Sequence, residues 1–179
     1  MNIIQIIAGT NRPGSNTLKV AQLVHSIYKD QGTAAELINL ADMPQEIFEP
    51  TCYAAKPASF TPFSKAVVES KGLVVVTPEY NGSFPGVLKY FIDMLEFPIS
   101  FEKRPVCFIG LAAGMWGALR SVEQLELIFG YRNAYIYPER VFMPLISDAW
   151  DANGKLKNTE WIKRLETQAK GFAAFTERF

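Results

Sequence analysis

The chain has 179 residues, of which 49% are hydrophobic and 20% are charged. This length and composition predict one ordered globular domain over residues 1–179 rather than a disordered chain. Lysine plus arginine and aspartate plus glutamate both total 18, so we expect no basic surface for nucleic acid or for an acidic membrane.

Apolar runs alternate with amphipathic stretches along the chain. We expect strands at residues 3–8, 35–40, 73–77, 105–110 and 133–137, with an extension at 141–145. Helices are expected at about 15–30, 62–70, 87–97, 118–129 and 161–172. Between 41 and 61 the chain is rich in proline, which predicts a loop-rich segment.

This alternation of strand and helix predicts right-handed crossovers, with helices on both faces of a parallel sheet. Five such strands fit an α/β, flavodoxin-like, doubly wound sheet in the order 2-1-3-4-5 better than the six-strand dinucleotide order. No apolar run is long enough to span a bilayer, and the basic flank of a signal peptide is missing. Cys52 and Cys107 suggest neither a disulfide framework nor a metal site, so we expect a soluble cytoplasmic protein.

The first loop with chemical character is GTNRPGSNT at residues 9–17, which connects the first strand to the first helix. It ends at a helix N-terminus, where free backbone N–H groups and the helix dipole favour an anion. Its hydroxyls, an amide and the Arg12 guanidinium can add hydrogen bonds to phosphate oxygens. Neither GxxxxGK[ST] nor GxGxxG is present. The simpler interpretation is that Ser15 and Asn16 only cap the helix.

The second loop is TPEYNGSFPG at residues 77–86, after a strand that Pro78 is not expected to extend. The pair Asn81-Gly82 favours a tight turn. Turned-out N–H and C=O groups can match the polar edge of a flat ring such as isoalloxazine, and Tyr80 offers an aromatic face. Glu79 has three interpretations: a surface charge, an acceptor that fixes the loop, or part of a subunit contact. Together the two loops predict a mononucleotide site for FMN, whereas an ordinary strand-to-helix connection is the alternative for the second.

GTNRPGSNT followed by PEYNGSFPGVLK at residues 78–89 resembles the NADPH-dependent FMN reductase family. That family has a flavodoxin-like fold and includes flavin, quinone, azo-dye and chromate reductases. The chain departs from the family pattern in its third loop, AAGMWG at residues 112–117, which is followed by arginine only at position 120.

The resemblance implies a set of cofactor-binding residues in each of the three loops. The first loop would hold the FMN phosphate, the second the isoalloxazine, and the third would close the other side. The residues concerned are Thr10, Arg12, Ser15, Asn16 and Thr17; Pro78, Glu79, Tyr80, Asn81, Gly82 and Ser83; and Ala113, Gly114 and Gly117.

The activity that the resemblance implies is a ping-pong reaction: hydride passes from NADPH or NADH to bound FMN, and then to a second acceptor. That acceptor would be a quinone, free flavin, an azo compound or a metal oxyanion, and the enzyme a homodimer or homotetramer. The sequence agrees in one respect, because no residue stands out as an acid, base or nucleophile and no metal set is visible. The only histidine, His25, falls in a helix away from both loops. Two alternatives are a flavodoxin-like electron carrier and a flavin-free binding module on the same fold.

Overall fold

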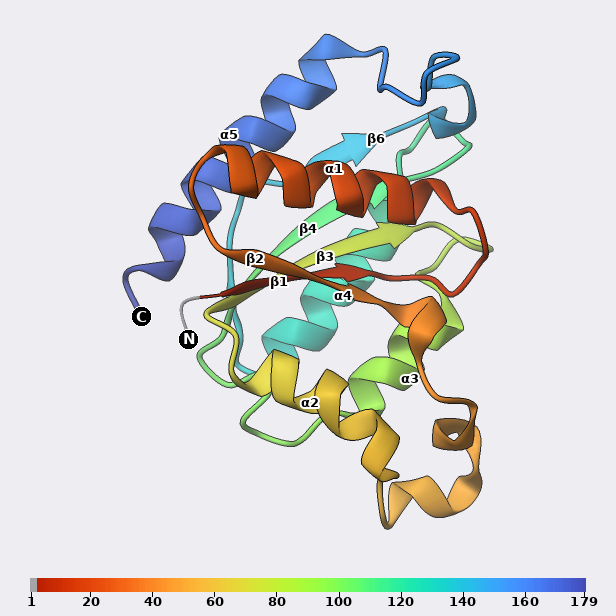
Figure 1. Ribbon diagram of the computed structural model, residues 1–179, viewed down its shortest axis with the longest axis vertical. Coiled ribbons are helices and arrows are strands. Elements are labelled where there is room, and N and C mark those ends of the chain that lie inside the picture. The colour runs from red at the N-terminus through yellow and green to blue at the C-terminus, as the bar shows by residue number, and fades with distance from the viewer. Residues whose placement is uncertain (1–2) are drawn as a thin grey trace.

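The computed structural model describes residues 3–179 and contains a parallel sheet between two layers of helices (Figure 1). The strands are β1 (Ile4–Ala8), β2 (Ala35–Asn39), β3 (Gly72–Pro78), β4 (Pro105–Leu111), β5 (Tyr135–Ile136) and β6 (Val141–Met143). Their order is β2-β1-β3-β4-β5, with β6 also paired to β4, and every pairing is parallel. The predicted flavodoxin-like, doubly wound fold with strand order 2-1-3-4-5 is therefore confirmed.

The edge of the sheet beyond β4 is built from two short strands instead of one. β5 pairs with Pro105 and Val106 at the start of β4, whereas β6 pairs with the last residues of β4. Pro138 lies between them and has no N–H to donate, so the ladder is interrupted there. The expected strand at 133–137 and its extension at 141–145 thus share one position in the sheet.

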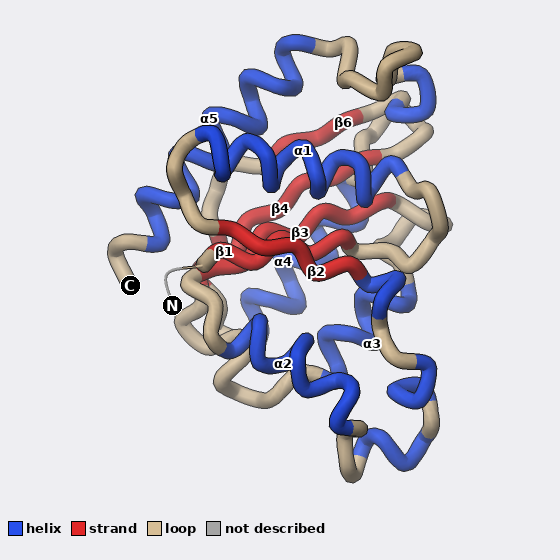
Figure 2. Tube along the Cα trace, in the orientation of Figure 1, coloured by secondary structure: helices blue, strands red, loops and turns tan. Residues whose placement is uncertain are grey.

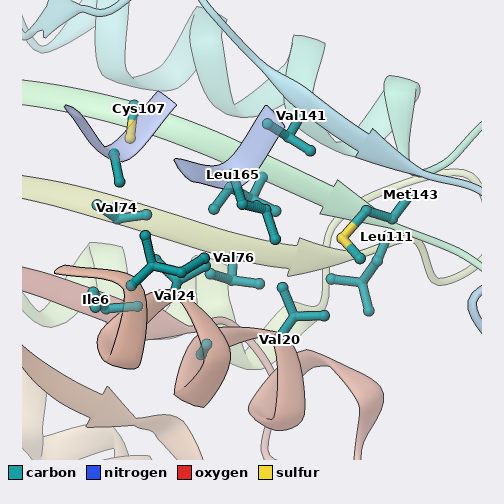
Figure 3. Close-up of a cluster of buried hydrophobic side chains, with 14 of the residues drawn as sticks. Ile6, Val20, Val24, Val74, Val76, Cys107, Leu111, Val141, Met143 and Leu165 are labelled. Carbon is teal, nitrogen blue, oxygen red and sulfur yellow. The ribbon is translucent and has the colours of Figure 1, made fainter. Parts of the chain in front are cut away.

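Helices cover the two faces unequally. α1 (Asn16–Asp30) and α5 (Thr159–Thr176) lie on one face, and α2 (Thr61–Val68), α3 (Gly86–Met94) and α4 (Leu119–Tyr131) lie on the other (Figure 1). Side chains along β3 alternate between the two cores, with Val74 and Val76 on the α1 side and Val75 on the α3 side. Figure 3 shows part of the first core, where side chains of α1 and α5 face those of the sheet. Within residues 3–179, no helix has the length and apolar character needed to cross a membrane.

The proline-rich segment between β2 and α2 consists of four short 3-10 turns (Figure 2). These are η1 (Leu40–Asp42), η2 (Gln45–Phe48), η3 (Pro50–Tyr53) and η4 (Ala58–Phe60). Pro44 and Pro57 each precede a turn, so they begin local structure as well as interrupting longer helices. The turns bury Ile47, Cys52 and Phe60 in the core on the α3 side.

Candidate cofactor-binding site

A cavity of about 360 Å³ lies at the carboxyl end of the sheet, beyond the last residues of β1, β3, β4 and β6. Its walls come from four segments: Arg12, Pro13, Gly14, Ser15, Asn16 and Thr17; Pro78, Glu79 and Tyr80; Leu111, Ala112 and Ala113; Ile146 and Ser147. β1 and β3 are neighbours whose following helices cover opposite faces, so the cavity lies at the topological switch point of the sheet. Its volume is in the range of small-molecule sites.

The end of the cavity beside α1 is rich in unused hydrogen-bond donors. Ser15 caps the helix, because its Oγ accepts a hydrogen bond from the backbone N–H of Leu18 at 3.1 Å. Ser15 is therefore the N-cap of α1, whereas Asn16 is the first residue of the helix. The backbone N–H groups of Asn16 and Thr17 and the guanidinium of Arg12 have no acceptor within residues 3–179. These donors, with the positive end of the α1 dipole, favour an anion.

The two glycines of the first loop have different roles. A Cβ on Gly9 would lie 2.8 Å from the carbonyl oxygen of Val76, so Gly9 allows the end of β1 to approach β3. Gly14 has a φ of 63°, faces open space and lines the cavity. Only Gly14 is therefore placed to bring backbone close to a ligand.

One hydrogen bond connects the first loop with the second. Thr10 is buried, and its Oγ1 lies 3.1 Å from the hydroxyl of Tyr80. The same Oγ1 accepts a hydrogen bond from the N–H of Arg12 at 3.3 Å. Tyr80 thus turns its hydroxyl toward the first loop, and Thr10 lies behind the lining of the cavity.

The second loop contains the tight turn expected from the pair Asn81-Gly82. These residues have φ values of 52° and 77°, and Tyr80 and Ser83 exchange two backbone hydrogen bonds of 2.8 and 3.1 Å. Two left-handed residues between such a pair are typical of a type I′ turn. The turn uses the backbone groups of Tyr80 and Ser83 internally. The lining of the cavity ends at Tyr80, so Asn81, Gly82 and Ser83 lie outside it.

Pro78 is the last residue of β3, although we expected the strand to end before it. It pairs with Leu111, and the next residue, Glu79, donates its N–H to the Leu111 carbonyl at 3.3 Å. The pairing of β3 with β4 therefore continues past Pro78, although this residue has no N–H to donate. The Pro78 carbonyl accepts from the Ser121 hydroxyl at 3.1 Å.

Glu79 is the only carboxylate of the cavity wall, and it is paired. Its Oε1 lies 3.3 Å from Nη1 of Arg120, and its side chain is 14% exposed. The other oxygen, Oε2, is buried and has no hydrogen-bond partner within residues 3–179. Of the three interpretations of Glu79, this geometry fits the acceptor that fixes the loop.

The third loop contributes to the cavity only through its first residues, Ala112 and Ala113. Gly114 and Gly117 lie outside the lining. Gly117 has a φ of 58°, and a Cβ there would lie 3.0 Å from the N atom of Met143. This glycine therefore lets the loop pack on β6.

One segment of the wall, Ile146 and Ser147, was missed entirely by the sequence analysis. Four further wall residues, Pro13, Gly14, Leu111 and Ala112, lie in or directly beside loops that it identified but were not among the predicted cofactor-binding residues. Ile146 and Ser147 belong to η5 (Ile146–Asp148), which follows β6, and Ile146 donates its N–H to the Ala112 carbonyl at 3.1 Å. The available signal was the apolar extension at 141–145: pairing it with β4 would have placed the next residues at the cavity.

The remaining polar candidates lie elsewhere. Nε2 of His25 is 3.0 Å from the Ala35 carbonyl oxygen and connects α1 to β2. Cys107 is buried in β4, and this burial raises the pKa of its thiol well above the ordinary value. In the described part of the chain, no group of three or more His, Cys, Asp or Glu side chains could hold a metal ion.

Comparison with known proteins gives a consistent result. Residues 1–147 match the family model of NADPH-dependent FMN reductases. The chain is 27% identical to an NAD(P)H-dependent FMN reductase of Pseudomonas aeruginosa and 27% identical to a quinone reductase of Escherichia coli, in each case over 96% of this chain and 94% of the relative. Its fold matches the flavoenzyme NAD(P)H:(acceptor) oxidoreductase FerB of Paracoccus denitrificans with a TM-score of 0.81 at 21% identity, over 99% of this chain and 98% of that one. The chain therefore belongs to the NADPH-dependent FMN reductase family.

Proposed function

We propose that this protein binds FMN in the cavity, accepts hydride from NADPH or NADH, and reduces a small-molecule acceptor such as a quinone. The observation that carries the proposal is the two-part character of the cavity. Unpaired N–H donors and Arg12 lie at one end, and Leu111, Ala112 and Ile146 lie at the other. A phosphate fits the first end and a flat, largely apolar ring fits the second.

The phosphate would be held by the first turn of α1. The backbone N–H groups of Asn16 and Thr17 would donate to its oxygens, with the Thr17 hydroxyl as a further donor. Arg12 would add charge and bidentate geometry. Because the Ser15 hydroxyl already caps the helix, Ser15 would contribute its backbone N–H.

The ring would lie between the end of β3 and the start of the third loop, beside Pro78, Tyr80 and Ala113. When bound, FMN supplies two-electron chemistry, since it can take up hydride from a nicotinamide and deliver it to an acceptor. The protein's part is to hold the ring, exclude water from one side with apolar groups, and leave the other side open to both substrates in turn. A shared open side gives the ping-pong order.

The same proposal includes a homodimer or homotetramer in the cytoplasm. Leu127 and Tyr131 on α4 are 75% and 82% exposed, and large exposed apolar side chains near one another favour self-association. The free thiols of Cys52 and Cys107 fit a reducing compartment.

The test is the visible absorption spectrum of the purified protein, recorded before and after addition of FMN and then of NADPH without oxygen. A bound-flavin spectrum that bleaches with NADPH and returns with a quinone supports the proposal. A flavin spectrum that persists with both NADPH and NADH favours an electron carrier. A protein that takes up no FMN overturns the proposed function.

A further inference from the structure

Three side chains from the first two turns of α4 reach the second loop of the cavity. Arg120 pairs with Glu79, and Ser121 donates to the Pro78 carbonyl. Gln124 uses both halves of its amide: Nε2 donates to the Gly82 carbonyl at 3.3 Å, and Oε1 accepts from the Ser83 hydroxyl at 2.5 Å. We call Arg120, Ser121 and Gln124 the α4 brace.

The spacing of the brace follows from helix geometry. At 100° per residue, positions i, i+1 and i+4 lie within about 100° of arc, so the three side chains share one side of α4. The adjacent positions Val122 and Leu125 are fully buried and face the core, whereas Glu123 faces solvent. The brace therefore occupies the strip of α4 between its buried face and its exposed face.

The second loop needs anchors of this kind because its turn lies beyond the end of the sheet. Within the loop, only the two backbone hydrogen bonds between Tyr80 and Ser83 close the turn. The hydroxyl contact between Tyr80 and Thr10 fixes the loop on the side of α1. The brace contacts residues 78, 79, 82 and 83, and so fixes the loop on the side of α4.

The brace also couples two walls of the cavity. α4 begins at Leu119, directly after Gly117 and Ala118, which have φ values of 58° and 70°. A Cβ on Gly110 would lie 2.7 Å from the Gly117 carbonyl oxygen, so this entry into α4 is packed tightly on β4. The helix that holds the second loop is thus itself fixed to the strand that leads into the third loop.

We propose that Arg120, Ser121 and Gln124 are positioning residues: they hold the loop 78–83 in place, and with it the lining residues 78–80, before any ligand arrives. The inference rests on the proposed function for the identity of that ligand, FMN. A loop that is already ordered loses less conformational entropy on binding, so the brace raises affinity without touching the ligand.

The binding test uses Gln124→Met, which keeps the length of the side chain and removes both of its hydrogen bonds. Titration with FMN, followed by quenching of its fluorescence, is expected to show a Kd about tenfold above that of the wild type. The matched control is Glu126→Gln, which breaks the other Arg–Glu pair of α4, where Nη1 of Arg140 lies 3.0 Å from Oε2 of Glu126. This control is expected to keep the wild-type Kd. A wild-type Kd in Gln124→Met overturns the proposal.

A second readout needs no flavin. Hydrogen exchange of the ligand-free protein is expected to be about tenfold faster at the amides of Tyr80 and Ser83 in Gln124→Met, and unchanged in Glu126→Gln. Unchanged exchange in Gln124→Met overturns the proposal independently of affinity. If the wild type binds no FMN while exchange in Gln124→Met accelerates, the proposed function fails and the brace stands.

Discussion

The amino and carboxyl ends of the sheet each have an arginine, Arg104 and Arg12, but within residues 3–179 only the guanidinium at the amino end is hydrogen-bonded to the protein. At the amino end, just before β4, the Arg104 guanidinium donates to carbonyls of Val68, Ser70, Ile99 and Ser100, and also to the Ser70 hydroxyl. At the carboxyl end, the Arg12 guanidinium lines the cavity and has no acceptor within residues 3–179.

This difference in hydrogen bonding indicates that Arg104 serves the stability of the fold and Arg12 the binding of a ligand. The guanidinium of Arg104 donates hydrogen bonds to the segments that precede β3 and β4. It is also partly removed from water, and this burial lowers the pKa of Arg104. Arg12 and the first N–H groups of α1 leave their hydrogen-bonding capacity open. We infer that the hydrogen bonds at the amino end stabilise the fold, whereas the free donors at the carboxyl end are available to a ligand.

The largest expected effect is on Arg104. Arg104→Met removes five hydrogen bonds of a charged donor and leaves several carbonyls short of a partner. We expect the free energy of unfolding in urea to fall by about 3 kcal/mol, with the Kd for FMN unchanged in the folded fraction. Arg104→Lys keeps the charge but not the planar fork, so most of this loss is expected to remain. Wild-type stability in Arg104→Met would contradict the comparison.

Arg12 is expected to show the reverse pattern. Arg12→Ala should raise the Kd for FMN by about 10- to 100-fold, because a charge-assisted contact to phosphate is lost. The free energy of unfolding should change by less than about 0.5 kcal/mol, since the side chain has no partner in the described part of the chain. Arg178→Ala, at an exposed position in the C-terminal turn, is the control for a general loss of positive charge. If Arg12→Ala destabilises the fold and keeps its affinity, the roles of the two ends are wrongly assigned.

Tyr80→Phe tests the connection between the two loops. The change removes the hydroxyl that lies 3.1 Å from Thr10 and keeps the ring in place. Loss of one partly buried hydrogen bond should raise the Kd for FMN about fivefold. The control is His25→Ala, which removes a contact between α1 and β2 far along the helix and should leave the Kd as in the wild type. Equal effects of the two substitutions would mean that Tyr80 has no special relation to the cavity.

The central strands could be predicted closely because they are continuous apolar runs. β1 and β4 each differ from their predicted ranges by one residue at one end, and β3 by one residue at each end, as expected for strands buried on both faces. The outer edge was harder to predict, because Pro138 interrupts the ladder and leaves strands of two and three residues. Such short strands owe their existence to pairing with β4 rather than to their own sequence.

The loops of the site could be predicted as loops, but their contacts could not. The sequence places Gly82 and Ser83 beside Tyr80 in a motif, whereas the fold turns their polar groups toward Gln124, some 40 residues away. Local patterns contain no information on such a partner. For the same reason the role of Gly117, which packs on β6, is visible only once the strand pairing is known.

The smallest expected effect concerns Cys107, which is buried in β4 between the two ends of the sheet. Burial raises the pKa of the Cys107 thiol, so the folded state favours the neutral form, whereas the unfolded thiol ionises near pH 8.5. The stability that this thiol contributes is complete below the unfolded pKa and declines as the pH rises above it. Between pH 8 and 9.5 the wild type should lose about 1 kcal/mol more free energy of unfolding than Cys107→Ala, as measured by urea denaturation. If the free energy of unfolding had the same pH dependence in both proteins, water would reach Cys107 in the folded state. The core beneath the two ends of the sheet would then not be closed to solvent.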